Sequence, residues 1–160
     1  MPRPHKYNIG TRKSHIFPVL NFQSDVFDAM FSHNFQETKS NRVVITDLEP
    51  EAVVEMLRFM YNNRVQSLDR VSRHLLAAAD KYNIQDLKEI CERSLCESMS
   101  VENVSSLLLF ARDRFSENLK RKAIDFITRN VQAVTHSPGW KDIVCEPVIM
   151  TEVVRAMGPR

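Results

Sequence analysis

From Asp69 almost to the C-terminus, apolar residues return every three or four positions, which is the spacing of one face of an amphipathic helix. Four such stripes follow one another: Leu75, Leu76, Ala79, Tyr82; Ile84, Leu87, Ile90, Cys91, Leu95; Val104, Leu107, Leu108, Ala111; and Leu119, Ala123, Phe126, Ile127. Successive helices of this kind predict an all-helical array rather than a parallel sheet. Because the stripes have no fixed period, a helical-repeat solenoid is disfavoured.

The helix limits can be predicted from capping and breaking residues. Ser100 and Ser116 are predicted to be N-caps of the third and fourth helices. The sequence Ser137-Pro138-Gly139 breaks the chain, and two short helices are expected after it, over 140–144 and 148–157.

The first third of the chain is mixed. Ser24 or Asp25 is predicted to cap a helix that runs through Phe31, and the β-branched segment 43–45 predicts a short strand. Pro50 occupies an expected first helical position, and an amphipathic helix should follow it as far as Tyr61. The pair at 62–63 should end that helix, because asparagine tolerates left-handed geometry.

Composition limits the function classes. The chain has 160 residues, 43% hydrophobic and 26% charged, enough for one substantial core or one domain with a helical appendage. A net charge of +2 with interleaved signs disfavours a nucleic-acid binder. No segment approaches a membrane span, so we expect the protein in the nucleus, the cytoplasm or both. The three cysteines are expected to be buried small hydrophobes.

Catalytic, metal and cofactor sites are not predicted. The five histidines are not spaced as ligand pairs with each other or with cysteine. Ser14 and His15 lack the nucleophile turn and oxyanion donors of a hydrolase. The isolated glycines offer no phosphate-binding loop.

The clearest candidate for a functional surface is a short polar loop after the first helix. An apolar helical face containing Phe27, Met30 and Phe31 leads into this loop, which carries Phe35 and Glu37. An exposed aromatic can anchor a partner protein, and a neighbouring carboxylate can set its orientation. The alternative is that Phe35 folds back on the domain and Glu37 is only solvated. Tyr61 could likewise line a binding groove or belong to the core.

The order of motifs resembles the BTB/POZ domain, in particular the speckle-type POZ (MATH–BTB) group. The resemblance covers nearly everything after His15. It is carried by Asp28-Ala29-Met30-Phe31, Phe35-Gln36-Glu37, Asn41-Arg42-Val43, Asp47-Leu48-Glu49-Pro50-Glu51, Phe59-Met60-Tyr61, Leu75-Leu76-Ala77-Ala78-Ala79-Asp80-Lys81-Tyr82, Ser100-Val101-Glu102-Asn103 and Gly139-Trp140-Lys141.

The resemblance implies an α+β BTB fold over 5–98, a small sheet capped by helices, followed by an all-helical 3-box and partial BACK region over 99–160. In BTB adaptors of cullin-3 ubiquitin ligases, the hydrophobic-x-Glu triplet at Phe35-Gln36-Glu37 packs against the cullin. Met30, Phe31 and Tyr61 would lie nearby, and His15 would be structural. The implied function is a non-enzymatic adaptor; the alternative is a BTB self-association scaffold without a ligase role.

Some features depart from the family pattern. Nothing before Tyr7 supplies the family's first strand and dimer-forming helix, so we expect weakened homo- or heterodimers with other BTB proteins. The substrate-holding MATH domain is also absent from the sequence, which would suit a shortened relative that competes with full adaptors. Finally, the apolar run 107–110 predicts either a sandwiched helix or one that lines a cleft.

Overall fold

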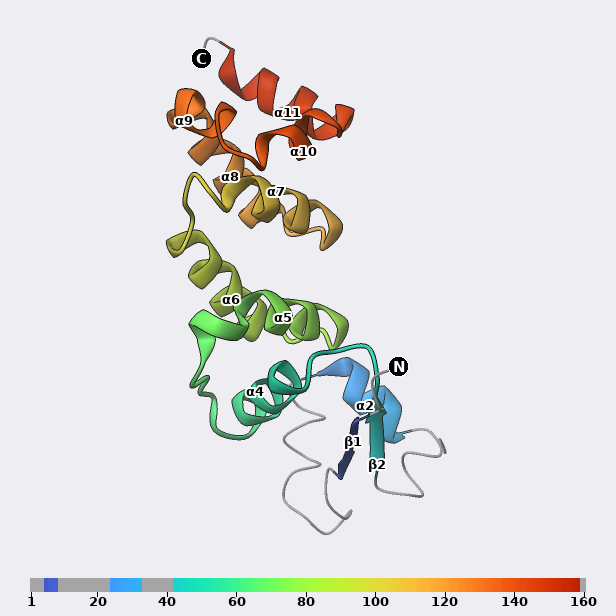
Figure 1. Ribbon diagram of the computed structural model, residues 1–160. Coiled ribbons are helices and arrows are strands. Elements are labelled where there is room, and N and C mark those ends of the chain that lie inside the picture. Colours follow the sequence, from blue (N-terminus) through green and yellow to red (C-terminus); the bar gives the residue numbers. More distant parts are fainter. Residues whose placement is uncertain (1–4, 9–23, 33–41, 159–160) are drawn as a thin grey trace. The chain divides into compact units, whose positions relative to one another are not determined.

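The structure is a computed structural model that describes residues 5–8, 24–32 and 42–158 (Figure 1). The chain divides into two compact units, Met1–Cys91 and Glu92–Arg160. The division falls inside helix α6 (Gln85–Glu97), so a single helix contributes residues to both units. The domain limits 5–98 and 99–160 stay a prediction.

Unit 1 contains two strands and three complete helices among its described residues. Strand β1 (His5–Asn8) pairs antiparallel with β2 (Arg42–Ile45), with His5 opposite Ile45 and Asn8 opposite Arg42. The expected strand segment 43–45 coincides with β2. The helices are α2 (Asp25–Ser32), α4 (Pro50–Asn62) and α5 (Leu68–Lys81).

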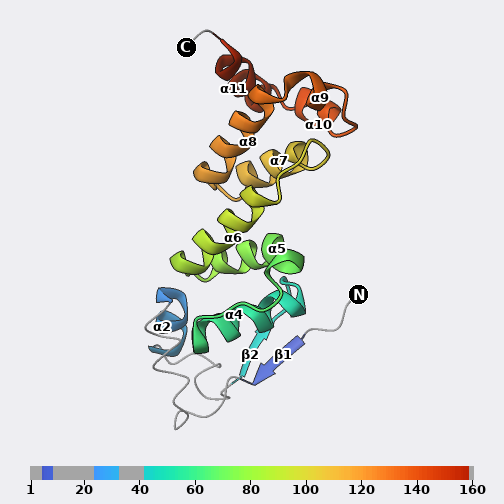
Figure 2. The ribbon, with the colours of Figure 1, turned by 90° about the vertical axis from the view of Figure 1, so that its left-hand side faces the viewer.

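Helices α4 and α5 pack on each other and supply most of the core of unit 1 (Figure 2). In α5 the predicted apolar stripe is buried. The largest fully buried side chains of the unit are Phe27, Ile45, Met56, Phe59, Met60, Leu75, Leu76, Tyr82 and Leu87. Burial of this many large apolar side chains is the main stabilising contribution of the unit.

The turn between α5 and α6 holds helix α2 in place. The Phe27 and Tyr82 rings are stacked with centroids 4.5 Å apart. Ser24 accepts the backbone N–H of Phe27 at 3.2 Å, which confirms it as the N-cap, and its hydroxyl donates to the carbonyl of Tyr82. Asn83 adds a hydrogen bond to Asp25 at 3.3 Å. Both ends of this contact come from sequence positions more than fifty residues apart, so α2 is fixed by tertiary packing.

Unit 2 is entirely helical in its described residues. It contains α7 (Val104–Asp113), α8 (Glu117–Arg129), α9 (Val131–Thr135), α10 (Trp140–Val144) and α11 (Pro147–Met157). Helix α8 packs against α7 and α11, and α10 contacts the same two helices (Figure 2). The two predicted C-terminal helices are confirmed, whereas the short α9 was not anticipated. The core residues are Val104, Leu108, Ala123, Ile127, Val134, Ile143, Ile149 and Val153.

The apolar run 107–110 belongs to a helix packed inside the unit. Leu107 and Leu108 are buried, while Leu109 and Phe110 are half-buried at its edge. Arg114 lies over the Phe110 ring at 5.9 Å, so an arginine covers part of the outer side. This favours the sandwiched arrangement over an open cleft.

Of the two predicted serine caps, Ser100 is wrong, and Ser116 is confirmed in its position but not in its hydrogen bond. Helix α7 begins at Val104 with Asn103 in the cap position, and the Asn103 amide oxygen accepts the N–H of Ser100 at 2.8 Å. Ser116 does precede α8, but it makes no side-chain cap bond; its hydroxyl donates to the Glu92 carboxylate at 2.6 Å. The side chain of Asn103 therefore bonds to Ser100, and that of Ser116 to Glu92, rather than to the first N–H groups of the helices that follow them.

The cysteines are less uniform than predicted. Cys91 is buried and Cys96 half-buried, and burial raises the pKa of the Cys96 thiol. Cys145 is exposed, so the prediction that it is a buried hydrophobe is wrong. Through the described ranges, no helix combines the length and apolar character that a membrane crossing requires.

Candidate interaction surface

Helix α4 is apolar on two sides, and in the part of the chain that the structure describes only one of them is buried. Its inner side buries Val53, Met56 and Met60. On the outer side Val54 is 44% exposed, Leu57 is half-buried and Tyr61 is 66% exposed. These three residues are spaced by three and four positions and therefore share one face of the helix. We call them the α4 face.

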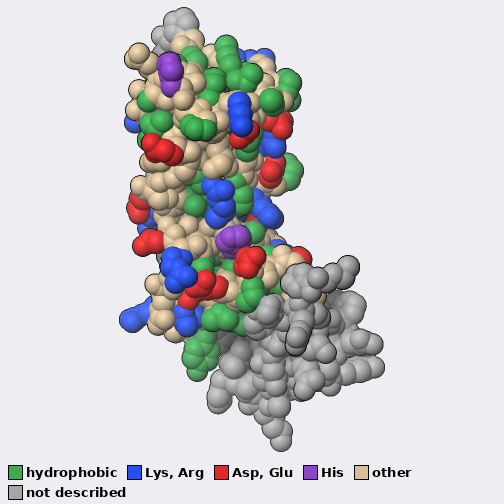
Figure 3. Space-filling view, viewed as in Figure 1, with side chains coloured by type: hydrophobic (Ala, Val, Ile, Leu, Met, Phe, Trp, Pro, Cys, Tyr) green, Lys and Arg blue, Asp and Glu red, His purple; other side chains and the backbone are tan. Residues whose placement is uncertain are grey.

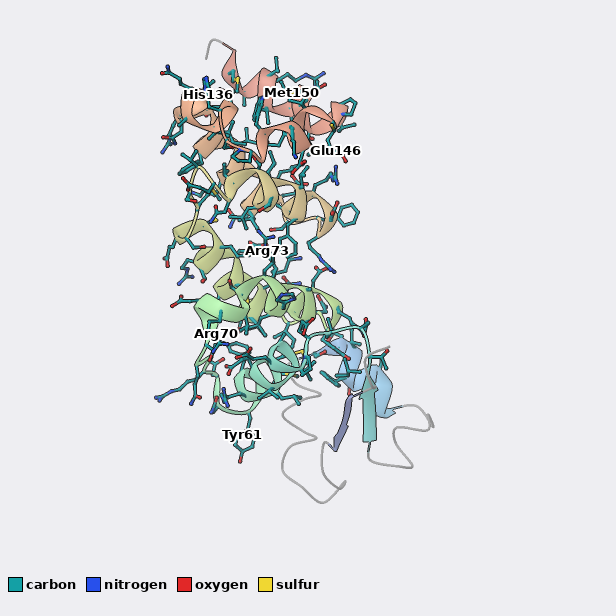
Figure 4. The ribbon with its side chains drawn as sticks, viewed as in Figure 1. Tyr61, Arg70, Arg73, His136, Glu146 and Met150 are labelled. Atoms are coloured by element: carbon teal, nitrogen blue, oxygen red, sulfur yellow. The ribbon has the colours of Figure 1, made fainter. Side chains whose placement is uncertain are left out.

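Tyr61 is therefore an exposed residue and not part of the core. Figure 4 shows its side chain projecting away from α4, and Figure 3 shows exposed hydrophobic side chains at the end of unit 1 where this helix lies. A tyrosine offers a large apolar ring with a hydroxyl that still reaches water, which makes it a common anchor in protein interfaces.

The C-terminus of α4 is fixed immediately after Tyr61. Asn63 adopts left-handed geometry (φ 56°), and its N–H donates to the carbonyl of Phe59 at 2.7 Å. The Asn62 side chain accepts the N–H of Arg64 at 3.2 Å. The predicted stop at 62–63 is confirmed, and it places Tyr61 at the edge of the helix.

A buried glutamate holds the loop that follows. Glu55 is only 3% exposed and accepts the N–H of Gln66 at 2.8 Å. Its other oxygen forms an ion pair with Arg58, one turn along the helix. Sequence reasoning missed Glu55, because a charged residue on an amphipathic helix is usually solvated.

A second ion pair fixes the segment that leads into α4. The Lys81 ammonium lies 2.7 Å and 3.0 Å from the two carboxylate oxygens of Asp47, and this hydrogen bonding lowers the pKa of Asp47. The same ammonium lies 5.3 Å from the ring centroid of Tyr82, whose own pKa is raised by burial. These contacts join the entry of α4 to the end of α5.

The other predicted surface residues are only partly described. Met30 and Phe31 belong to the last turns of α2, where the structure gives the backbone. Phe35 and Glu37 lie outside the described residues. The structure therefore shows one of the five predicted side chains, Tyr61, and adds Val54 and Leu57 beside it.

The described residues contain no group of three histidine, cysteine or acidic side chains able to hold a metal ion. His74 and His136 are exposed, and Nδ1 of His136 lies 2.6 Å from the carbonyl oxygen of Gln132. The α4 face, apolar with a polar tip, is suited to contact with a protein.

Comparison with protein families supports the same interpretation of the surface. A family model for the BTB/POZ domain matches residues 18–99, just over half of the 160 residues. The match includes α2, α4, α5 and α6, and so it contains the whole α4 face.

Proposed function

The chain belongs to the BTB/POZ domain family, and on that premise we propose that it binds the N-terminal region of cullin-3 as a non-enzymatic, adaptor-type subunit of a ubiquitin ligase. BTB domains are protein-interaction modules that mediate dimerisation and bind cullin-3 in many proteins. The motif series described above supports a place in the speckle-type POZ group. We also propose that the protein works in the nucleus, the cytoplasm or both.

The exposed α4 face is the observation that carries this proposal. It presents Val54 and Tyr61 to solvent, although the opposite side of the same helix is already fully buried. An amphipathic helix in an isolated domain needs only one apolar side, so a second one indicates a partner. We propose that Phe35 and Glu37 extend this surface, with Met30 and Phe31 supporting it.

Calorimetry with the purified N-terminal region of cullin-3 tests the proposal. We expect one-to-one binding by the wild type, and at least a tenfold loss for Val54→Lys and for Tyr61→Ala, or about 1.4 kcal/mol each. Val148→Lys is the matched control, because Val148 is an exposed valine on a helix of unit 2. Thermal unfolding of each variant shows whether it is folded.

Two results would overturn the assignment. Folded wild type that does not bind cullin-3 excludes the adaptor function and favours the self-association scaffold. Binding that survives both Val54→Lys and Tyr61→Ala places the cullin elsewhere on the chain. The double variant Phe35→Ala with Glu37→Lys then decides whether the preceding loop alone is responsible.

A further inference from the structure

An open pocket of about 570 Å³ lies in unit 2, where α8 ends and α9 begins. The residues that line it are Arg129, Asn130, Val131, Gln132, Ala133 and His136, and these six described residues include no acidic side chain. The nearest acid along the chain, Asp125, instead lines a second pocket, on α8 and α11. An arginine and a histidine beside amides make the first pocket suited to an anionic ligand. We call it the α8–α9 pocket.

A break in the helix at Asn130 shapes this pocket. The N–H of Asn130 donates to the carbonyls of Phe126 and Ile127, both at 3.1 Å, and its side-chain amide donates to the Phe126 carbonyl at 2.9 Å. These bonds end α8, so that Arg129 occupies its last turn with an exposed side chain. The next helix starts at once, because the carbonyl of Asn130 accepts the N–H of Val134 at 3.0 Å.

Helix α9 is short, but its position in unit 2 is fixed. Val134 is fully buried in the core, and its carbonyl accepts the N–H and the hydroxyl of Ser137 at 3.0 Å and 2.8 Å. His136 follows the helix, and Nδ1 of its ring lies 2.6 Å from the carbonyl of Gln132 (Figure 4). Because a carbonyl oxygen only accepts, Nδ1 carries a hydrogen and the ring presents Nε2 on its other side.

Arg129, Gln132 and His136 bring three kinds of hydrogen-bond donor to one pocket, and all three are exposed. A guanidinium donates to two oxygens of one anion, a carboxamide donates through its NH₂ group, and a protonated imidazole donates through Nε2. One arginine alone can satisfy both oxygens of a carboxylate. A phosphomonoester has three acceptor oxygens and a larger negative charge, so it makes use of the additional donors.

We propose that the α8–α9 pocket binds a phosphorylated serine or threonine side chain of a partner protein. The pocket is larger than one phosphate group requires, and it is open to solvent. Val131 and Ala133 add apolar lining beside the donors. The residues that flank the phosphorylated position therefore pack on these two side chains, while the phosphate accepts from Arg129, Gln132 and His136. Phosphorylation of the partner then switches on its binding to unit 2.

Fluorescence polarisation tests the proposal on the full chain. The probe is a labelled peptide selected from a library with phosphoserine fixed at its centre, and it is compared with its unphosphorylated form. We expect binding of the phosphorylated form only, and at least about a tenfold rise in its Kd for Arg129→Ala and for His136→Ala. Arg155→Ala is the matched control, because Arg155 is an exposed arginine of α11 outside the pocket. Thermal unfolding shows whether each variant is folded.

The variant Arg129→Lys distinguishes a shaped site from general attraction between charges. Lysine keeps a positive charge on the last turn of α8, and so preserves the helix end, but it donates as a point charge rather than through a planar fork. We expect a several-fold loss of affinity, and we expect the NMR signals of the His136 ring to shift when the phosphopeptide is added. Unchanged affinity together with unshifted ring signals contradicts the proposed site.

Other outcomes overturn the proposal directly. A folded wild type that selects no phosphorylated peptide from the library does so, as does binding that Arg129→Ala and His136→Ala weaken no more than Arg155→Ala. Inorganic phosphate and vesicles that contain phosphatidylinositol phosphate are the competing probes. If the vesicles bind through Arg129 and the phosphopeptides do not, the ligand is a membrane headgroup and the proposal is wrong.

This proposal goes beyond cullin-3 binding and does not depend on it. The α4 face belongs to unit 1 and the α8–α9 pocket to unit 2. Val54→Lys should therefore leave phosphopeptide binding unchanged, and Arg129→Ala should leave cullin-3 binding unchanged. The two proposals can thus fail separately.

Discussion

The turns that follow α4 and α7 share a backbone geometry but use opposite kinds of residue. Asn63 has φ 56° and Phe115 has φ 51°, both in the left-handed region. Asparagine adopts that region readily, whereas for other residues it costs about 1–2 kcal/mol. The first turn is therefore encoded by its own residue, and the second is imposed on a residue that opposes it.

Tertiary contacts explain how the second turn is maintained. In each case a buried glutamate outside the turn accepts hydrogen bonds from it: Glu55 from the N–H of Gln66, and Glu92 from the hydroxyl of Ser116 at 2.6 Å and the amide of Asn118 at 3.3 Å. Because a buried glutamate supports each turn, the two turns differ mainly in the left-handed residue itself, which is asparagine in the first and phenylalanine in the second. Phe115 keeps a left-handed backbone while its side chain is 86% exposed, so burial of its ring does little to offset the strain.

The largest expected effect comes from removing the glutamates. Glu92→Ala should lower the free energy of unfolding by about 2–3 kcal/mol, because it leaves the buried Ser116 hydroxyl without an acceptor. Glu55→Ala should cost less, about 1–2 kcal/mol, since its partner Arg58 reaches solvent. Urea unfolding measures both. If Glu55→Ala lowers the free energy of unfolding as much as Glu92→Ala or more, the burial of the hydrogen-bond partners does not determine how much each glutamate stabilises the protein.

An exchange of the two turn residues should give effects of opposite sign. Phe115→Asn should stabilise the protein by about 1 kcal/mol, and Asn63→Phe should destabilise it by about 1–2 kcal/mol, because each changes the strain at one left-handed position. Thermal and urea unfolding at one protein concentration provide the comparison. If Phe115→Asn instead lowers stability, the phenylalanine ring has a packing contact that offsets its strain.

The smallest expected effect is on the stability of the protein at low pH, and it comes from the ion pair beside the start of α4. Asp47 beside Lys81 has a lowered pKa when folded, so the pair stabilises the protein above the unfolded pKa. That contribution should disappear as the pH falls below about 4. Since both side chains are partly exposed, it should be below about 1 kcal/mol and weaken in salt. Asp47→Asn should remove this part of the pH dependence, and an unchanged acid profile would show that the pair contributes nothing.

The sequence predicted the helices well because each has a buried apolar stripe. Leu75, Leu76 and Leu87 are buried as their spacing required, and the C-terminal helices begin and end close to the predicted residues. The sequence pattern could not decide whether Tyr61 is exposed. Met60 and Tyr61 are neighbours, and the helical periodicity allows either of them to face the core. The main contact residues expected for the surface, Phe35 and Glu37, lie outside the described residues.

The two buried glutamates that the sequence analysis missed depend on distant partners. Glu55 and Glu92 are charged residues that local patterns assign to solvent, and their burial follows from donors 11 and 24 residues away. Phe115 gives no glycine or asparagine signal for a left-handed turn. The break at Asn130 between α8 and α9 was not predicted; there the Asn130 side-chain amide donates to the carbonyl of Phe126 at 2.9 Å.

The position of the unit boundary inside helix α6 affects how the chain can change during evolution. Modules are exchanged most readily where a gene can be joined at a flexible linker, since a cut there leaves both halves intact. Here the division between the units lies after Cys91, in the middle of the helix that runs from Gln85 to Glu97. Recombination at that boundary would split the helix and expose apolar residues from both halves. The second unit should therefore be inherited together with the first, and changes in it should accumulate by substitution rather than by replacement of the whole module.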